Sequence, residues 1–349
     1  MSLLKVRGTW RRVLAALAGV LIAACGATTS GTSSNSKKLD DLTVQMAYTW
    51  VSSQFYSTYL LGEQKGFYSR HGINAKFVEG TGSLTTVQLV ANGKATIAAE
   101  VDTGATARAV AQGAQIKMVA ATLPTNPLAV LSRGDNAINN PQQLIGKKIA
   151  IPPGTTQAQI WPAFLAKNHL TSAQVTTVSL PATAVYQALA TKQIDGYVSF
   201  SFSNLPLLQA LNLHPVAMLL SSYGITYTPG EGVVVQDSLI KNNPGLIRRF
   251  LLATQEAIQY SMKHPVEAAA AGVALQPLDL KQSNAESQIR AVAQQFVMFP
   301  PPAGKSLFYM RESQWASLLQ LLTTYAGLTN APKPTDCYTN ALLPSSANA

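Results

Sequence analysis

The stretch Leu144-Ile145-Gly146-Lys147-Lys148-Ile149-Ala150-Ile151-Pro152-Pro153-Gly154-Thr155-Thr156 begins a second cycle of alternating strands and helices. Its apolar run predicts a strand, the prolines and Gly154 predict a turn, and the threonines open a helix that ends near Asn168. A first cycle with the same alternation starts at Leu39. The sequence therefore predicts an α/β protein with mostly parallel sheets.

The two cycles predict two lobes joined by two strand crossings. Lobe I is expected to comprise residues 39–130 and 232–349, and lobe II residues 131–231. We expect the crossings near residues 130–131 and 233–236, where they permit a hinge with a ligand cleft between the lobes. The expected strands are 42–48, 75–79, 96–99, 117–122, 129–132, 146–151, 175–179, 196–200 and 232–235. The expected helices, besides the one ending at 168, are 55–69, 84–92, 103–112, 184–191, 244–264, 266–275, 285–298 and 312–325.

The N-terminus has the pattern of an export signal. A basic stretch, Lys5 to Arg12, precedes the apolar run Val13 to Ala24, which is too short to span a bilayer and reads as a signal peptide over residues 1–24. The run ends in Ile22-Ala23-Ala24-Cys25, which resembles a bacterial lipobox, so Cys25 is the expected lipidation site. The alternative is an ordinary signal peptide that happens to end beside a cysteine. Residues 25–38 then form a flexible tether at the outer face of the cytoplasmic membrane.

Composition excludes several classes of protein. With 47% hydrophobic and 12% charged residues, the chain of 349 residues is globular and not disordered. Four of its ten net positive charges precede Cys25, and the rest form no dense basic run, so nucleic-acid binding is not expected. Cys337 is the only other cysteine, which predicts an inert thiol and no disulfide.

A series of short motifs resembles the nitrate/sulfonate/taurine and thiamine-pyrimidine/riboflavin precursor-binding group of ABC-transporter substrate-binding proteins. The matching segments are Glu63–Tyr68, His71–Ile73, Leu89–Ala95, Asp102–Gly104, Leu144–Ala150, Gly154–Thr155, Ile194–Gly196, Asn243–Phe250 and His264–Ala269. The resemblance implies a bilobed periplasmic-binding-protein type II fold, a ligand held in the cleft, and closure on binding. It also implies docking onto an ABC permease with its ATPase, by a monomer without cofactor or metal.

In lobe I, candidate ligand contacts follow the expected strands, since ligands of open α/β sheets lie beyond the carboxyl ends of strands. An aromatic group can stack on a planar ligand, helix-opening N–H groups can hold an anion, and acids can accept from an amine, imide or amidine. The competing interpretations are packing within the lobe for Trp50, a plain turn for residues 80–83 and helix capping for Asp102. The candidates are Tyr48, Thr49, Trp50, Thr81, Ser83, Glu100, Asp102 and Thr103.

Lobe II and the return crossing supply a second set. Thr155 and Thr156 open a helix, and Phe200 and Ser201 follow a strand and could supply an aromatic surface with one hydroxyl. Tyr223 and Glu231 lie near the return crossing. These candidates are Thr155, Thr156, Phe200, Ser201, Tyr223 and Glu231.

The candidate positions carry aromatic and acidic residues but no arginine or lysine. This composition favours a planar, nitrogen-bearing heterocycle, such as a pyrimidine or flavin precursor, over nitrate, an alkanesulfonate or taurine. A ligand sensor for a membrane receptor is a further alternative. An enzyme, such as a thiamine-pyrimidine synthase, is not expected. The four histidines lack metal-ligand spacing, and no Gly-x-Ser-x-Gly motif or phosphate-binding loop occurs.

Overall fold

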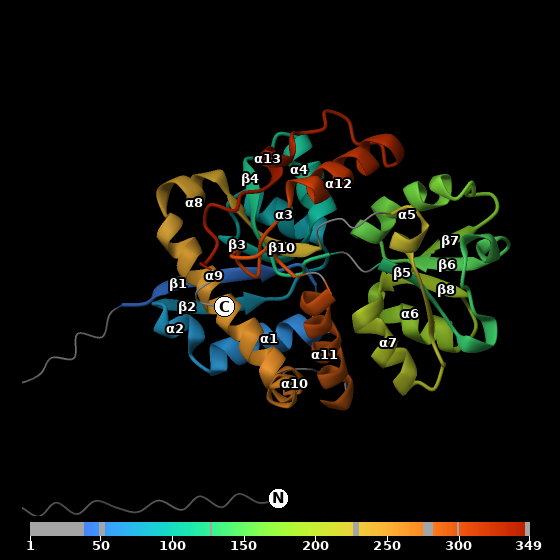
Figure 1. Ribbon diagram of the computed structural model, residues 1–349, viewed down its shortest axis with the longest axis horizontal. Helices are drawn as coiled ribbons and strands as arrows, with labels where there is room; N and C mark the ends of the chain where they lie inside the picture. Colours follow the sequence, from blue (N-terminus) through green and yellow to red (C-terminus); the bar gives the residue numbers. More distant parts are fainter. Residues whose placement is uncertain are drawn as a thin grey trace, which may run out of the picture. The chain divides into compact units, whose positions relative to one another are not determined.

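The computed structural model describes residues 38–48, 53–125, 128–225, 230–274, 282–298 and 300–345. Among these described residues, ten strands form two separate five-stranded sheets, with order β2-β1-β3-β10-β4 in sheet 1 and β7-β6-β8-β5-β9 in sheet 2 (Figure 1). This confirms the bilobed α/β fold; we call the part built on sheet 1 lobe I and the part built on sheet 2 lobe II. The expected signal peptide and Cys25 lie outside the described residues.

Sheet 1 is mainly parallel, with one antiparallel strand inserted between β3 and β4. Its strands are β1 (Asp40–Met46), β2 (Ile73–Val78), β3 (Ile97–Asp102), β4 (Ile116–Ala121) and β10 (Glu231–Gln236). β2 pairs parallel to β1 and alternates buried with exposed residues, whereas β3 is buried throughout because strands cover both of its edges and helices its faces. Helices α3 (Ser83–Ala91) and α4 (Thr103–Ala111) pack on one face, and α1 (Ser53–Gln64) and α2 (Phe67–Arg70) on the other (Figure 1).

Sheet 2 has the same construction. Its strands are β5 (Leu128–Ser132), β6 (Lys148–Ile151), β7 (Thr176–Ser179), β8 (Gly196–Phe200) and β9 (Val216–Leu219). Its helices are α5 (Thr156–Lys167), α6 (Ala182–Ala190) and α7 (Ser201–Ala210), with short 3₁₀ turns η1 (Gly134–Asn136), η2 (Pro141–Leu144) and η3 (Leu220–Tyr223). The Thr155 hydroxyl caps α5 by accepting from Ala158 N, as expected of a threonine before a helix.

The chain after β10 is helical. It forms α8 (Asp237–Asn242), α9 (Pro244–Lys263), α10 (Pro265–Val273), α11 (Gln282–Met298), α12 (Glu312–Tyr325) and α13 (Pro334–Cys337). α9 and α10 pack against α1, while α11 also contacts α7 and α12 contacts α5. The C-terminal helices therefore belong to lobe I and touch helices of lobe II. Among the described residues, no helix has both the length and the apolar character needed to cross a membrane.

Three features differ from the sequence-based expectation. The helix expected over 55–69 is divided into α1 and α2 at Gly66, whose φ of 70° is left-handed. α7 and β9 were not predicted; α7 contains Pro206, which argues against a helix in sequence. β4 ends in sheet 1 at Ala121 and β5 begins in sheet 2 at Leu128, so all of β5 belongs to sheet 2; the chain leaves lobe II after η3 and re-enters sheet 1 where β10 begins, at Glu231.

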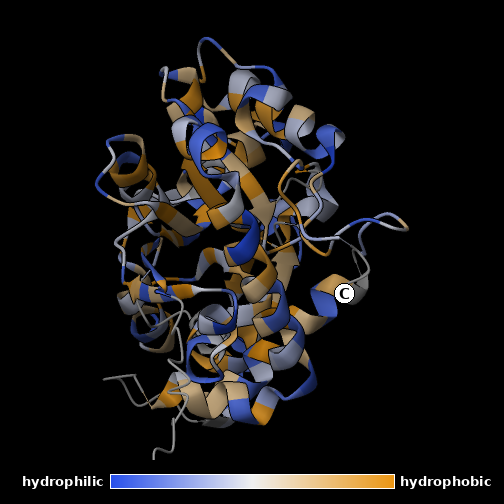
Figure 2. Ribbon diagram, turned by 90° about the vertical axis from the view of Figure 1, so that its left-hand side faces the viewer, coloured by the Kyte–Doolittle hydropathy of each residue, from blue (hydrophilic) through white to orange (hydrophobic). Residues whose placement is uncertain are grey.

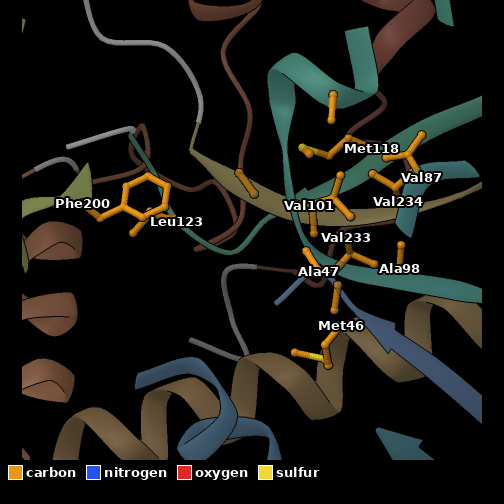
Figure 3. Packing of buried hydrophobic residues seen from close by; sticks show 14 of the residues in the cluster. Met46, Ala47, Val87, Ala98, Val101, Met118, Leu123, Phe200, Val233 and Val234 are labelled. Atoms are coloured by element: carbon orange, nitrogen blue, oxygen red, sulfur yellow. The ribbon is translucent and has the colours of Figure 1, made fainter. Parts of the chain in front are cut away.

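One large buried hydrophobic cluster runs through sheet 1 and continues into lobe II. Figure 3 shows part of it, including Met46 of β1, Val101 of β3 and Val233 of β10, all with no exposed surface. Coloured by hydropathy, the strands are mainly orange and the helices mix orange with blue, as expected when helices cover a sheet with one face only (Figure 2). The packing of these buried residues determines where the polar residues at the strand ends lie.

Candidate functional site

A network of hydroxyl and carboxyl groups joins Tyr48, which follows β1, Ser83, which begins α3, and Asp102, which ends β3. The Tyr48 hydroxyl donates to Asp102 Oδ2 over 2.6 Å, and Ser83 Oγ lies 3.0 Å from the same oxygen. The Asp102 main-chain N–H donates to Ser83 Oγ over 3.0 Å. Ser83 and Asp102 are buried, so the structure brings together three of the residues expected from sequence.

The loop before Ser83 reaches this network because glycine allows it to lie on the end of β1. Gly80 N donates to Tyr48 O over 3.0 Å, and Gly82 N donates to Ala47 O over 2.7 Å. A Cβ on Gly80 would lie 2.0 Å from Met46 O, so no other residue fits there. Thr81, in contrast, is exposed.

Glu231 completes the acidic part of the site from β10. It lies directly opposite Asp102 in the antiparallel pair of β10 and β3 and is 2% exposed. Burial, followed by the charge of Asp102, raises the pKa of the Glu231 carboxyl well above its ordinary value, while the Tyr48 hydroxyl acts in the opposite direction. A second carboxyl beside Asp102 is therefore disfavoured in its ionised form.

Glu100 lies two residues before Asp102, at an irregularity in β3. The register between β10 and β3 shifts between Gly232 and Val234, and Glu100 has φ of 60°, which is left-handed for a residue with a side chain. Its side chain has no exposed surface, and neither carboxylate oxygen has a hydrogen-bond partner among the described residues. Burial, then the charge of Glu231, raises its pKa.

Two tyrosines lie next to these acids, Tyr48, which is half-buried, and Tyr59, which has no exposed surface. The pKa of Tyr48 is raised by burial and then by Asp102 and Glu231, and that of Tyr59 by burial and then by Glu100. Both phenols thus stay protonated, and the single O–H of Tyr48 is used by its hydrogen bond to Asp102. Within the described part of the chain, no group of three histidine, cysteine, aspartate or glutamate residues is arranged to hold a metal ion.

Lobe II approaches this site through the loop before α5. A Cβ on Gly82 would lie 3.7 Å from Gly154 O, so the two helix-opening loops nearly touch. The Thr155 hydroxyl donates to Pro152 O over 2.7 Å, which fixes that loop. The side chain of Thr156, like Thr49 and Trp50, lies outside what the structure describes.

The other candidates of lobe II are built into that lobe. Phe200 stacks on Phe202 with ring centroids 5.8 Å apart. Ser201 is 9% exposed and begins α7. The Tyr223 hydroxyl donates to Asn139 O over 2.9 Å, within its own lobe. Thr103, in lobe I, is buried at the start of α4.

Three polar residues of this region escaped the sequence analysis. Arg108 of α4 donates to Gln159 Oε1 of α5 over 2.8 Å, and Gln288 of α11 donates to Ser203 O of α7 over 2.7 Å, so both join the lobes. Gln157, near the start of α5, is buried and its Oε1 has no partner among the described residues. No motif marks these residues; only helix faces placed in three dimensions reveal them.

A separate groove of about 660 Å³ lies in lobe II between α5 and β7. Its lining is mostly apolar and includes Trp161, whose indole N–H donates to Thr177 Oγ1 over 3.0 Å. Because the groove carries no charged side chain and its indole is already paired, we place the candidate site at Asp102 and Glu231 instead.

Comparison with known proteins gives both a family and a fold. The family model described as "NMT1/THI5 like" matches residues 54–268. The alkanesulfonate-binding protein SsuA from Xanthomonas axonopodis, solved with bound MOPS, superposes with a TM-score of 0.64 at 15% identity and covers 85% of this chain and 96% of its own.

Two further solved structures have the same fold. The periplasmic nitrate-binding protein NrtA from Synechocystis gives a TM-score of 0.57 at 11% identity, covering 86% of this chain and 93% of its own. The Candida albicans CA3427 product, described as having the generic periplasmic binding protein fold, gives a TM-score of 0.52 at 17% identity. The match covers 84% of this chain and 98% of its own. A search of curated proteins found no significant match.

Proposed function

Since the chain belongs to the NMT1/THI5-like family, we propose that it is an extracytoplasmic solute-binding protein that delivers a small molecule to an ABC importer. Its permease and ATPase are the proposed partners, and lipidation at Cys25 anchors it to the outer face of the cytoplasmic membrane. The proposal is supported by the two-sheet fold, shared with periplasmic binding proteins, and by polar residues gathered where the two lobes approach each other.

We infer that the ligand is a planar, nitrogen-bearing heterocycle, such as a pyrimidine or flavin precursor. The observation that carries this inference is the set of buried acceptors formed by Asp102 and Glu231 beside the Tyr48 hydroxyl. Ring nitrogens and amino groups offer N–H donors to carboxyl oxygens, and a site built from buried carboxyl groups favours a ligand that supplies such donors. Trp50, two residues after Tyr48, is proposed to stack on the ring.

Nitrate, an alkanesulfonate or taurine is the alternative ligand class, favoured by what the similar structures bind. The electrostatics of the site oppose it. In the described part of the chain, no lysine, arginine or histidine pairs with Tyr48, Ser83, Glu100 or Glu231. An anion would meet acids without a compensating cation.

A thermal-shift screen of the soluble form lacking residues 1–25 tests both ligand classes. The panel pairs pyrimidines, flavins and purines with sulfonates, nitrate and taurine. We expect stabilisation by a heterocycle, and loss of that stabilisation in Asp102→Asn and Trp50→Ala but not in the surface control Glu312→Gln. Stabilisation by the anions alone would contradict the proposed ligand class. Genes for a permease and ATPase beside this one would separate an importer component from a receptor-bound sensor.

A further inference from the structure

We propose that the ligand is a cation, with an amidinium-type group whose N–H donors face Glu231 and Glu100. The inference rests on the proposed function and names the charge of the ligand, which the choice of a heterocycle leaves open. It is carried by the positions of two carboxyl groups that have no compensating charge among the described residues.

The first step is geometric. Glu231 stands opposite Asp102 on the neighbouring strand, and Glu100 comes from the irregular turn of β3 two residues before Asp102. Asp102 Oδ2 already accepts from Tyr48 and lies within reach of Ser83. Both oxygens of Glu100 lack partners in the part of the chain that the structure describes, although the side chain is fully buried. A forked donor is the group that two such oxygens accept best.

The second step concerns charge. The ion pairs among the described residues use Asp40, Asp135, Glu256, Glu267 and Glu286, and none includes Glu100 or Glu231. Burial disfavours the ionised form of both glutamates, and an adjacent cation would favour it. A bound cation would therefore form charge-assisted hydrogen bonds with the two carboxylates, whereas a neutral ligand would form neutral hydrogen bonds only. The site thus favours a positively charged ligand over a neutral one of the same shape.

The third step concerns the buried neighbours. Burial, then the charge of Glu100, raises the pKa of Tyr59, which has no exposed surface. The groups facing the two glutamates are thus Tyr59 of α1, Tyr68 of α2, Asp102 of β3 and Tyr48 after β1, all neutral or acidic. These neighbours supply acceptors and phenols but no positive charge, which leaves that charge to the ligand.

The test compares two planar probes of nearly equal shape, benzamidine and benzamide, of which only the first is charged. Calorimetric titration of the soluble form lacking residues 1–25 should show benzamidine binding at least about tenfold more tightly than benzamide, the difference between charged and neutral hydrogen bonds. Glu231→Gln and Glu100→Gln should each reduce that preference to about threefold or less, while Glu312→Gln, an exposed control on α12, should keep it. Circular dichroism melts establish that each variant folds; two independent glutamates keep the test valid if one variant does not.

Equal affinity for the two probes would overturn the inference, and so would no benzamidine binding at about 10 mM. If a neutral heterocycle from the screening panel still binds in that case, the proposed solute-binding function stands and only the charge assignment fails. Retention of the benzamidine preference in both glutamine variants would also overturn the inference.

Discussion

Replacing Glu100 by glutamine should make the ligand-free protein more stable at neutral pH. A raised pKa in the folded state means that the folded protein binds more protons than the unfolded chain, in which a glutamate titrates near about 4.3. Stability should then fall as the pH rises above that value, until the folded carboxyl ionises. Because Glu100 is fully buried and has no partner among the described residues, its contribution is not screened by solvent.

The magnitude follows from the linkage relation. One such group lowers the free energy of unfolding by about 1.4 kcal/mol for each pH unit in this window. The pKa of Glu231 is raised as well, so the wild-type slope should be steeper than the Glu100→Gln slope. At about 2 °C per kcal/mol for a protein of this size, the variant should gain about 3 °C relative to wild type for each unit above pH 5.

The assay is urea unfolding of wild type, Glu100→Gln and the control Glu312→Gln at half-unit steps between about pH 5 and pH 7.5. The window lies above the range in which the exposed, ion-paired acids with lowered pKa values, such as Glu267, lose their charge. Plotted against pH, the free energies of unfolding of wild type and control should fall in parallel, and that of Glu100→Gln should fall less steeply. Parallel lines for all three proteins would refute the idea that Glu100 is buried without compensation.

Three further outcomes are expected. Gly80→Ala should lower the melting temperature by several degrees, because the added Cβ would overlap a main-chain oxygen of β1. Gly245→Ala should leave the melting temperature unchanged, because a Cβ there would have no neighbour closer than 3.9 Å. Equal melting temperatures for the two variants would contradict the close packing at Gly80. Cys337 should resist a thiol reagent in the folded form lacking residues 1–25 and react only after unfolding, because burial raises its pKa to about 12; rapid labelling in the native state would be inconsistent with this burial. Arg108→Ala should weaken binding of the best ligand by about fivefold to tenfold in calorimetry, because its hydrogen bond to Gln159 of α5, which favours approach of the lobes, is lost. Unchanged affinity would argue against a role in closure.

Sequence reasoning predicted the parts of the fold that depend on local pattern. The alternation of short apolar runs with helices predicted nine of the ten strands, including β10 returning to sheet 1. It missed α7, because Pro206 in its middle is a helix-breaking signal that packing against β5 and α11 overrides. The strand-end rule led to Tyr48, Ser83 and Asp102, which do lie within hydrogen-bonding distance of one another.

What the sequence did not reveal depends on irregular backbone and on long-range contacts. Glu100 was chosen for its position after a strand, but its isolation follows from a register shift that no periodicity encodes. Gln157 and Gln288 lie on helices whose sequences carry no binding motif. Their buried polar groups are identified only from the packing of helices in three dimensions. Thr155 was proposed as a ligand contact, but its hydroxyl interacts with Pro152 O and the start of α5.

A crystal structure with the best heterocycle from the screen would test the central claim most directly. We predict the ligand between the loops at 80–83 and 152–156, contacting both lobes, with a nitrogen donor within hydrogen-bonding distance of Asp102 or Glu231. A ligand seated instead in the apolar groove between α5 and β7, or held by one lobe only, would contradict the account.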